Sequence, residues 1–187
     1  MQLVQPIRDK KKIEDMKKML KSNNLRDYCL FVLGINSGLR ISDLLNLKIS
    51  DVVEGKKIKD RISLREQKTG KVKDFPIGAT SVKALKEYLD TWDFTYEDYL
   101  FKSRKGNAAI SREQAWRILS SAADSVGINE AIGTHTLRKT FGYWAFKSGV
   151  DITRIQKLLN HSSPGITLAY IGITRDELDD VYLNLNL

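Results

Sequence analysis

The sequence GTHTLRKTFGYWAFKSG, residues 133–149, joins a polar start to an apolar helical face. Its apolar positions lie on one side of a helix: Leu137, Phe141 and Trp144. His135 and Arg138 are three residues apart and therefore project from one face near the helix N-terminus. That end carries free N–H groups and the positive pole of the helix dipole, which attract anions. We therefore predict a helix over residues 135–148, ended by Gly149, with an anion-binding start.

The tetrapeptide His135-Thr136-Leu137-Arg138 also fits a second interpretation, in which the histidine is buried and satisfied by backbone groups and the arginine lies on the surface. The stretch Gly38-Leu39-Arg40 is similarly ambiguous, since its arginine follows a glycine turn and precedes an amphipathic helix. Asp43 could orient Arg40, or the two could form an ordinary surface ion pair of little energetic value. Neither motif by itself distinguishes an anion-binding site from an ordinary structural role.

Residues 57–65 and 71–77 alternate apolar and polar side chains, a pattern typical of half-buried strands. They are separated by Gln67-Lys68-Thr69-Gly70 and predict a β-hairpin with Gly70 at the turn. Lys68 at the tip could place an ammonium group near a phosphate or a leaving oxygen. Taken by itself, it could equally be a solvated surface lysine.

His161, within Leu159-Asn160-His161-Ser162-Ser163, is followed nine residues later by Tyr170. Pro164 and Gly165 turn the chain between them, which allows both polar side chains to reach one cleft. The alternative for Tyr170 is a core tyrosine whose hydroxyl group is satisfied.

Helical periodicity covers most of the remaining chain, and no internal repeat, low-complexity tract or linker interrupts it. Helices are predicted after an Asp9 cap, over residues 25–35, at about residues 40–47, from Thr80, from a Ser111 cap to Gly127, over residues 151–159, after Pro164 and from Thr174. The sequence therefore predicts one domain over residues 1–187, mainly α with a small antiparallel β-sheet, an α+β fold.

The chain has 187 residues, of which 42% are hydrophobic, so it is long enough to bury a core and unlike a disordered chain. It carries 31 basic and 23 acidic residues, a net charge of +8. Residues 8–21 have seven basic and three acidic side chains, and residues 56–73 have eight and two. Residues 175–187 have one arginine against four carboxylates. Such asymmetry suits docking on a phosphate backbone.

A single cysteine, Cys29, excludes an internal disulfide framework. The two histidines are 26 residues apart and lack the cysteine pair or carboxylate cluster of a metal site. No GxSxG elbow or Walker phosphate loop is present. Because no apolar run reaches the ~18–20 residues of a membrane span and the first residues lack a secretory pattern, we expect a cytoplasmic protein with no membrane partner.

Taken together and in order, these motifs resemble the catalytic domain of the tyrosine recombinase family, the phage-integrase type. The resemblance is carried by Gly38-Leu39-Arg40 with Asp43, Gln67-Lys68-Thr69-Gly70-Lys71, His135-Thr136-Leu137-Arg138, Leu159-Asn160-His161-Ser162-Ser163 and Tyr170. It extends over residues 4–182. One departure is Asn160, where relatives often have glycine.

The resemblance implies a site-specific DNA recombinase or integrase that cleaves and rejoins strands without metal, ATP or another cofactor. Tyr170 would attack a scissile phosphodiester, forming a 3′-phosphotyrosyl bond and releasing a 5′-hydroxyl group. Arg40 and Arg138 would clamp the non-bridging oxygens, and Asp43 would orient Arg40.

The same resemblance implies the acid–base roles. Lys68 would protonate the leaving 5′-oxygen, and His135 would accept or share the proton of the tyrosine. His161 would form a hydrogen bond to the phosphate.

The implied partner is double-stranded DNA, with accessory DNA-bending proteins as further candidates. Family members usually carry an N-terminal core-binding domain, which we expect to be absent because the sequence begins almost directly with the catalytic domain. We therefore expect weakened DNA affinity, a monomer in isolation and a tetramer on synapsed DNA.

Three other interpretations compete with a recombinase: a catalytically inactive or regulatory DNA-binding remnant of the family, a type IB topoisomerase, and a basic helical scaffold protein. The full set of motif residues argues against a decayed site, and the short chain fits a topoisomerase less well.

Overall fold

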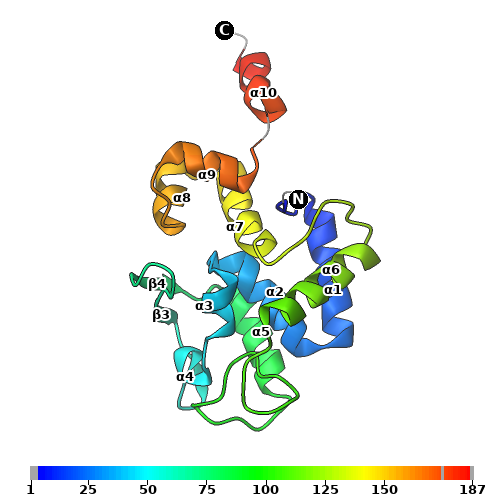
Figure 1. Ribbon diagram of the computed structural model, residues 1–187, viewed down its shortest axis with the longest axis vertical. Helices are drawn as coiled ribbons and strands as arrows, with labels where there is room; N and C mark the ends of the chain where they lie inside the picture. The colour runs from blue at the N-terminus through cyan, green and yellow to red at the C-terminus, as the bar shows by residue number, and fades with distance from the viewer. Residues whose placement is uncertain (1–3, 174, 186–187) are drawn as a thin grey trace.

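Helix α2 (Leu25–Ser37) lies at the centre of the helical body in the computed structural model, which describes residues 4–173 and 175–185. It packs against α1 (Lys10–Asn23), α5 (Ala79–Leu89) and α7 (Thr136–Lys147), and α6 (Arg112–Ser125) packs on α1 (Figure 1). An apolar run with no polar face explains this central position, because such a helix is stable only when it is covered on all sides.

Both ends of α2 follow from local chemistry. The Asn24 side chain accepts hydrogen bonds from the backbone N–H groups of Arg26 and Asp27 at the start of the helix. Gly38 ends it in the left-handed region, with φ at 60°. A Cβ atom on Gly38 would lie 2.5 Å from Cδ1 of Phe141 on α7, so glycine also permits the close approach of the two helices there. The chain then enters α3 (Ile41–Leu45) and α4 (Ile49–Val52).

Within the described residues, four strands form two small antiparallel sheets. Strands β1 (Val53–Glu54) and β2 (Lys57–Ile58) pair around a turn at Gly55. Strands β3 (Arg61–Arg65) and β4 (Val72–Pro76) form the longer hairpin, and Gly70 lies at its turn with φ at 66°. The hairpin was predicted correctly.

The prediction of one continuous strand over residues 57–65, in a single sheet, was wrong. The chain bends at Asp60, and residues 57–58 pair back onto β1 instead of continuing the hairpin. The physical reason is the positive φ of Gly55, which allows a tight turn that the alternation of side chains does not reveal.

A second, smaller core joins α7, α8 (Ile152–Leu158) and α9 (Pro164–Ile171). Its buried members are Tyr143, Ile155, Leu159 and Ile171. Gly142 on α7 allows this contact, because a Cβ there would lie 2.6 Å from Cγ2 of Ile171. This packing brings the end of α9, which carries Tyr170, against α7.

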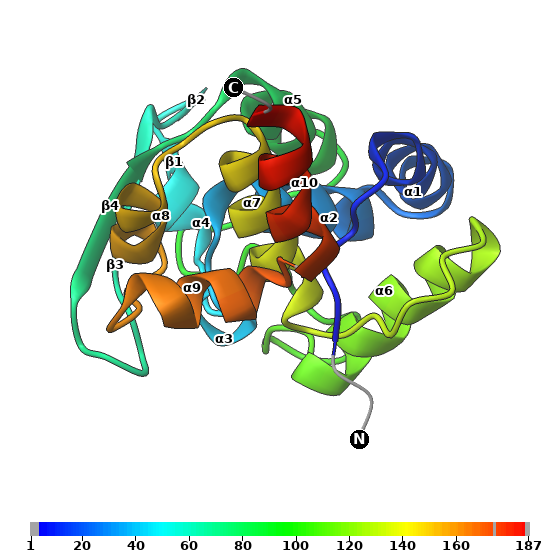
Figure 2. The same ribbon diagram turned by 90° about the horizontal axis from the view of Figure 1, so that it is seen from above.

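Helix α10 (Arg175–Leu185) projects beyond the helical body in Figure 1 and lies nearest the viewer in Figure 2. Its Glu177 joins it to α7, because Glu177 Oε1 accepts a hydrogen bond from the Tyr143 hydroxyl group at 3.1 Å. The predicted start of this helix, Thr174, lies outside the described residues. Its last turns expose Tyr182, Leu183 and Leu185.

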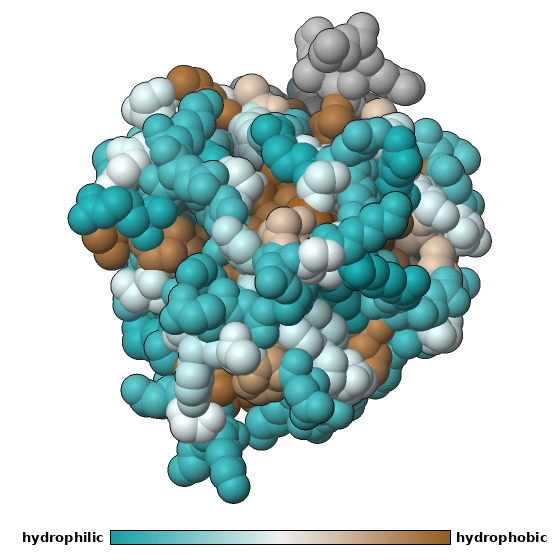
Figure 3. All heavy atoms as spheres, turned by 60° about the horizontal axis from the view of Figure 1, so that its bottom comes forward, coloured by the Kyte–Doolittle hydropathy of each residue, from teal (hydrophilic) through white to brown (hydrophobic). Residues whose placement is uncertain are grey.

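The mainly helical fold class with small antiparallel sheets is confirmed. The Asp9 and Ser111 caps are also confirmed, since each side chain accepts a backbone N–H two or three residues on. None of the helices in the described part of the chain has both the length and the apolar character needed to cross a lipid bilayer. Figure 3 shows a largely hydrophilic face on which apolar side chains emerge in small, separate areas.

Candidate active site

Arg138, on the first turn of α7, is 2% exposed and held by two backbone carbonyl groups. Its Nη1 donates to the carbonyl oxygen of Gly38 at 2.6 Å, and its Nη2 donates to that of Leu159. A guanidinium group has five N–H donors, so these bonds fix its plane and leave donors for an anion. Burial lowers the pKa of Arg138, but arginine stays protonated at any physiological pH.

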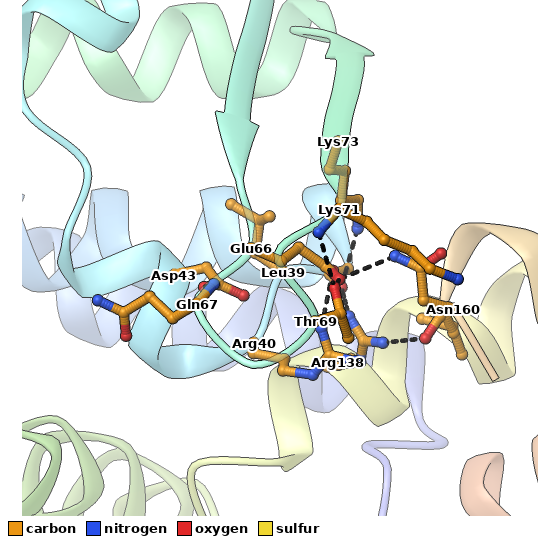
Figure 4. Close-up of polar contacts among 12 residues, drawn as sticks. Leu39, Arg40, Asp43, Glu66, Gln67, Thr69, Lys71, Lys73, Arg138 and Asn160 are labelled. Atoms are coloured by element: carbon orange, nitrogen blue, oxygen red, sulfur yellow. Dashed lines mark hydrogen bonds and ion pairs between the residues drawn. The ribbon is translucent and has the colours of Figure 1, made fainter.

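Arg40, immediately before α3, forms an ion pair with Glu66 at 2.8 Å (Figure 4). Among the described residues Arg40 forms no ion pair with Asp43, and the predicted role of Asp43 in orienting Arg40 stays a prediction. Asp43 is buried, and its Oδ1 accepts the backbone N–H of Gln67 at 2.9 Å. The reason is that Asp43 points from α3 to the start of the hairpin turn, whereas Glu66 enters from the end of β3 and reaches the guanidinium group of Arg40.

Glu66 joins three separate parts of the site. Its carboxylate accepts the Thr69 hydroxyl group at 2.7 Å and the Asn160 side-chain amide at 2.8 Å, besides pairing with Arg40. Burial by itself raises the pKa of Glu66, but the bonds from Thr69, Arg40 and Asn160 outweigh it and hold the pKa below its usual 4.5. The carboxylate is therefore ionised at neutral pH and ties the hairpin turn to both neighbouring segments.

Asn160 adopts a left-handed backbone conformation, with φ at 49°, at the turn between α8 and α9. This conformation favours glycine and is tolerated by asparagine. In this chain the side chain adds the bond to Glu66, which glycine lacks. The departure from glycine therefore links the turn that carries His161 to the hairpin.

Tyr170 lies near the end of α9, with its hydroxyl oxygen 3.3 Å from Nδ1 of His135. Its ring also makes an edge-to-face contact with the ring of His161, with 4.8 Å between centroids, and Lys139 Nζ lies 5.0 Å from its centroid. Burial raises the pKa of Tyr170, and the charges of Arg138 and Arg40 partly oppose that rise. The hydroxyl group is thus protonated at neutral pH, with a histidine nitrogen beside it.

His161 is oriented by Thr167, which is fully buried on α9. Its Nδ1 lies 3.2 Å from the Thr167 hydroxyl oxygen, and that hydroxyl group donates to the carbonyl oxygen of Ser163 at 3.1 Å. Because the threonine proton is already used, Nδ1 of His161 is the donor in this pair. Burial, followed by the charges of Arg138 and Arg40, lowers the pKa of His161 to about 4. The same first cause, burial, lowers the pKa of His135.

Lys68 is exposed at the hairpin tip, as predicted from the sequence, and the structure gives it no hydrogen bond or ion pair with the described residues. Burial is the main cause of the lowered pKa of His135, and the charge of Lys68 is a smaller contribution to it. The structure therefore brings together Arg40, His135, Arg138, His161 and Tyr170, with Lys68 on an adjoining arm.

Three polar residues of this site were missed by the sequence interpretation: Glu66, Lys73 and Thr167. Glu66 and Lys73 were counted only as charges of a basic segment. A signal for Glu66 did exist, because it follows Ile62 by four residues and so continues the inward face of its strand. Thr167 carried no such signal, since its partner is set by the turn between α8 and α9.

The fold is that of tyrosine recombinase catalytic domains. The crystal structure of XerA recombinase matches with a TM-score of 0.77 and 26% identity, covering 98% of this chain and 64% of that one. The XerH site-specific recombinase, in a post-cleavage complex with palindromic difH substrate, matches with a TM-score of 0.74 over 93% of this chain and 51% of that one. Its 19% identity makes this a likeness of fold.

The phage integrase family model matches residues 8–177, and the chain belongs to that family. It is 47% identical over 182 residues to a probable integrase/recombinase, YoeC, of Bacillus subtilis, covering 97% of each chain. It is 32% identical over 163 residues to tyrosine recombinase XerD of Corynebacterium glutamicum, covering 85% of this chain and 52% of that relative, so it spans about half of XerD. Site-specific recombination is the class of activity that these relationships support.

Proposed function

We propose that this protein cleaves and rejoins double-stranded DNA at specific sites through a 3′-phosphotyrosyl intermediate formed on Tyr170. The observation that carries the proposal is the 3.3 Å approach of the Tyr170 hydroxyl oxygen to His135 Nδ1, next to two oriented arginines. A protonated phenol is a weak nucleophile, and an adjacent base removes that limitation. The same arrangement is unsuited to a core tyrosine, whose hydroxyl group would be satisfied by backbone.

In the proposed step the Tyr170 oxygen bonds to phosphorus and the bond to the 5′-oxygen breaks. The proton of the phenol passes to His135, whose lowered pKa in the free protein means that its ring is neutral and able to accept it. The new ester keeps the energy of the phosphodiester, so a 5′-hydroxyl group from another strand can reverse the step without ATP or metal.

The two arginines would stabilise the extra charge that the non-bridging oxygens gain in the transition state. Arg138 is held by two carbonyl groups and Arg40 by Glu66, so both are oriented before substrate arrives. Preorganised donors of this kind contribute about 10²–10³ each in rate.

Lys68 would supply the proton to the leaving 5′-oxygen. Its position at an exposed hairpin tip lets it reach a duplex lying across the site, and the Glu66 network anchors the base of that arm. His161 would contact the phosphate through Nε2, because Nδ1 is engaged by Thr167. In the free protein Nε2 is an acceptor, so this contact requires His161 to take up a proton as the phosphate binds.

DNA is the proposed partner, and the basic residues of segments 8–21 and 56–73 would contact its backbone. We propose a tetramer on synapsed DNA, a monomer in isolation, and the cytoplasm as the working compartment. The apolar side chains exposed on α10 support a role for this helix in subunit contacts. Accessory DNA-bending proteins are further candidate partners.

A catalytically inactive DNA-binding remnant is the second candidate, and covalent trapping separates the two. A duplex from the regions flanking the gene, carrying a 5′-bridging phosphorothiolate at the candidate site, is incubated with the protein and the products are separated under denaturing conditions. Because the released thiol rejoins poorly, cleavage accumulates as a protein–DNA adduct. We expect an adduct with wild type and none with Tyr170→Phe.

The matched control is Tyr96→Phe, which removes an exposed tyrosine hydroxyl group, and that hydroxyl group has one described bond, to the Gly55 carbonyl oxygen at 3.1 Å. This variant should form the adduct as wild type does. DNA binding by wild type without any adduct would favour the inactive remnant, and an adduct that persists in Tyr170→Phe would overturn the assignment of the nucleophile.

A further inference from the structure

Lys73 is a buried lysine in the middle of the site, and the proposed chemistry gives it no role. It lies on β4, paired with Leu64 of β3, and is 9% exposed, whereas Lys68 and Lys71 on the same hairpin are exposed. Lysine is almost never buried unless its ammonium group has partners. We therefore expect the ammonium group of Lys73 to be held by partners inside the protein.

The Nζ of Lys73 donates to the carbonyl oxygens of Ser37 and Gly38, at 3.3 and 3.2 Å. The Gly38 carbonyl oxygen also accepts a hydrogen bond from Arg138 Nη1 at 2.6 Å. This one oxygen atom therefore accepts hydrogen bonds from both a guanidinium and an ammonium group. Gly38 is two residues before Arg40, so the turn that Lys73 contacts also positions Arg40.

The surroundings of Lys73 are strongly charged. Four charged groups act electrostatically on its Nζ: Arg138 on α7, Glu66 at the end of β3, and Arg40 and Asp43 at α3. Lys157 on α8 and Asp74 on β4 line one cleft together with Lys73. Burial, followed by the charge of Arg138, lowers the pKa of Lys73 to about 8. Its charge can therefore change within a pH range in which the protein can be assayed.

We propose that Lys73 is a positioning residue for the phosphate-binding arginines, acting through the Ser37–Gly38 turn to hold Arg40 and Arg138 in register with the hairpin that carries Lys68. This inference rests on the proposed function and deepens it. Transition-state donors lose much of their effect when displaced by about 1 Å. Lys73 should consequently influence the rate of cleavage more than the affinity for DNA, because it is too enclosed to be one of the many exposed charges along the backbone.

The test compares Lys73→Met, which keeps much of the length of the side chain without donors or charge, with Lys73→Arg, which keeps both. Lys83→Met, an exposed lysine on α5, is the control for the loss of one positive charge. Cleavage of the phosphorothiolate duplex is measured at saturating DNA, and affinity is measured separately by fluorescence anisotropy. Thermal unfolding and circular dichroism establish that each variant is folded.

We expect Lys73→Met to slow cleavage at saturating DNA by roughly tenfold or more, as for other displaced transition-state donors, with affinity close to that of Lys83→Met. Lys73→Arg should recover most of the rate. The wild-type rate should also fall as the pH rises through about 8 or somewhat above, because bound phosphate opposes loss of the proton. Lys73→Arg should lack that component of the profile.

A folded Lys73→Met that cleaves as fast as wild type would overturn the inference, and so would a pH profile shared by wild type and Lys73→Arg. If Lys73→Met does not fold, the profile of Lys73→Arg decides alone. Failure of wild type itself to form an adduct would overturn the proposed function and this inference together, whereas a cleaving wild type with an unaffected Lys73→Met would overturn only the inference.

Discussion

Arg40 pairs with Glu66 at 2.8 Å, across the gap between α3 and the end of β3. Glu66 has a fully buried side chain, and its carboxylate also accepts hydrogen bonds from the side chains of Thr69 and Asn160. The pair thus connects a candidate phosphate-binding arginine to the hairpin arm and to the turn before α9.

Glu66→Gln should slow cleavage without abolishing it. The glutamine amide would face donors from Arg40 or Asn160, leaving one of them unpaired in a buried place. We expect a loss of about 10–10² in the rate at saturating DNA, part of what removal of an oriented donor costs. Asn160→Gly removes only one of the bonds and should have a smaller effect. An unchanged rate in Glu66→Gln would contradict the positioning role of the carboxylate.

Glu66 should also contribute to stability in a pH-dependent way. Its pKa in the folded protein lies below the usual 4.5, so its ionised form favours folding above about that pH, and the contribution disappears as the pH falls through the folded value. The difference in melting temperature between wild type and Glu66→Gln should therefore shrink on acidification below about pH 4.5. A difference that stays constant from neutral to acidic pH would show that the network does not depend on the charge.

His161 should stay neutral across the physiological range. Its pKa is lowered to about 4, so its imidazole signals should not titrate between about pH 8 and pH 5 in the free protein. The chain has two histidines, and His135→Gln leaves only His161 in the nuclear magnetic resonance spectrum. Thr167→Val should disturb the ring orientation and alter the Nδ1 proton signal. Titration of His161 near its ordinary value would contradict this arrangement.

Arg138→Lys should behave much like Arg138→Ala. A lysine could not donate to the carbonyl oxygens of Gly38 and Leu159 and also keep donors on the phosphate, since it lacks the planar fork. We expect both variants to lose about 10²–10³ in cleavage rate. Retention of near wild-type activity in Arg138→Lys would show that charge, and not geometry, is what this position supplies.

Lys68→Ala should be rescued by a better leaving group. A 5′-thiolate can leave near neutral pH without being protonated, because a thiol is far more acidic than an alcohol. A 5′-alkoxide is a poor leaving group unless an acid protonates it. The variant should therefore cleave an ordinary phosphodiester duplex poorly and a 5′-bridging phosphorothiolate duplex at close to the wild-type rate. Arg138→Ala is the comparison, since a better leaving group does not replace a lost phosphate donor. Equal defects on both duplexes would remove Lys68 from the general-acid role.

Local sequence signals were enough to predict which polar side chains are available for the site and roughly where each helix or strand begins. Periodicity placed α2 and α7, the turn residues placed the hairpin tip, and the side-chain caps placed the starts of α1 and α6. These features are local, because spacing along a helix or strand decides which face a residue occupies. The order of the motifs was enough to indicate the family.

The pairing of those side chains, in contrast, depends on how the elements pack against one another. Asp43 is nearer to Arg40 along the chain, yet Glu66 is the residue that reaches it, because the hairpin folds back over α3. Lys73 became part of the site for the same reason. Its partners, the carbonyl oxygens of Ser37 and Gly38, lie at the end of α2, and the distance between α2 and β4 depends on the packing of the whole core. A buried charge is stable only where such partners converge.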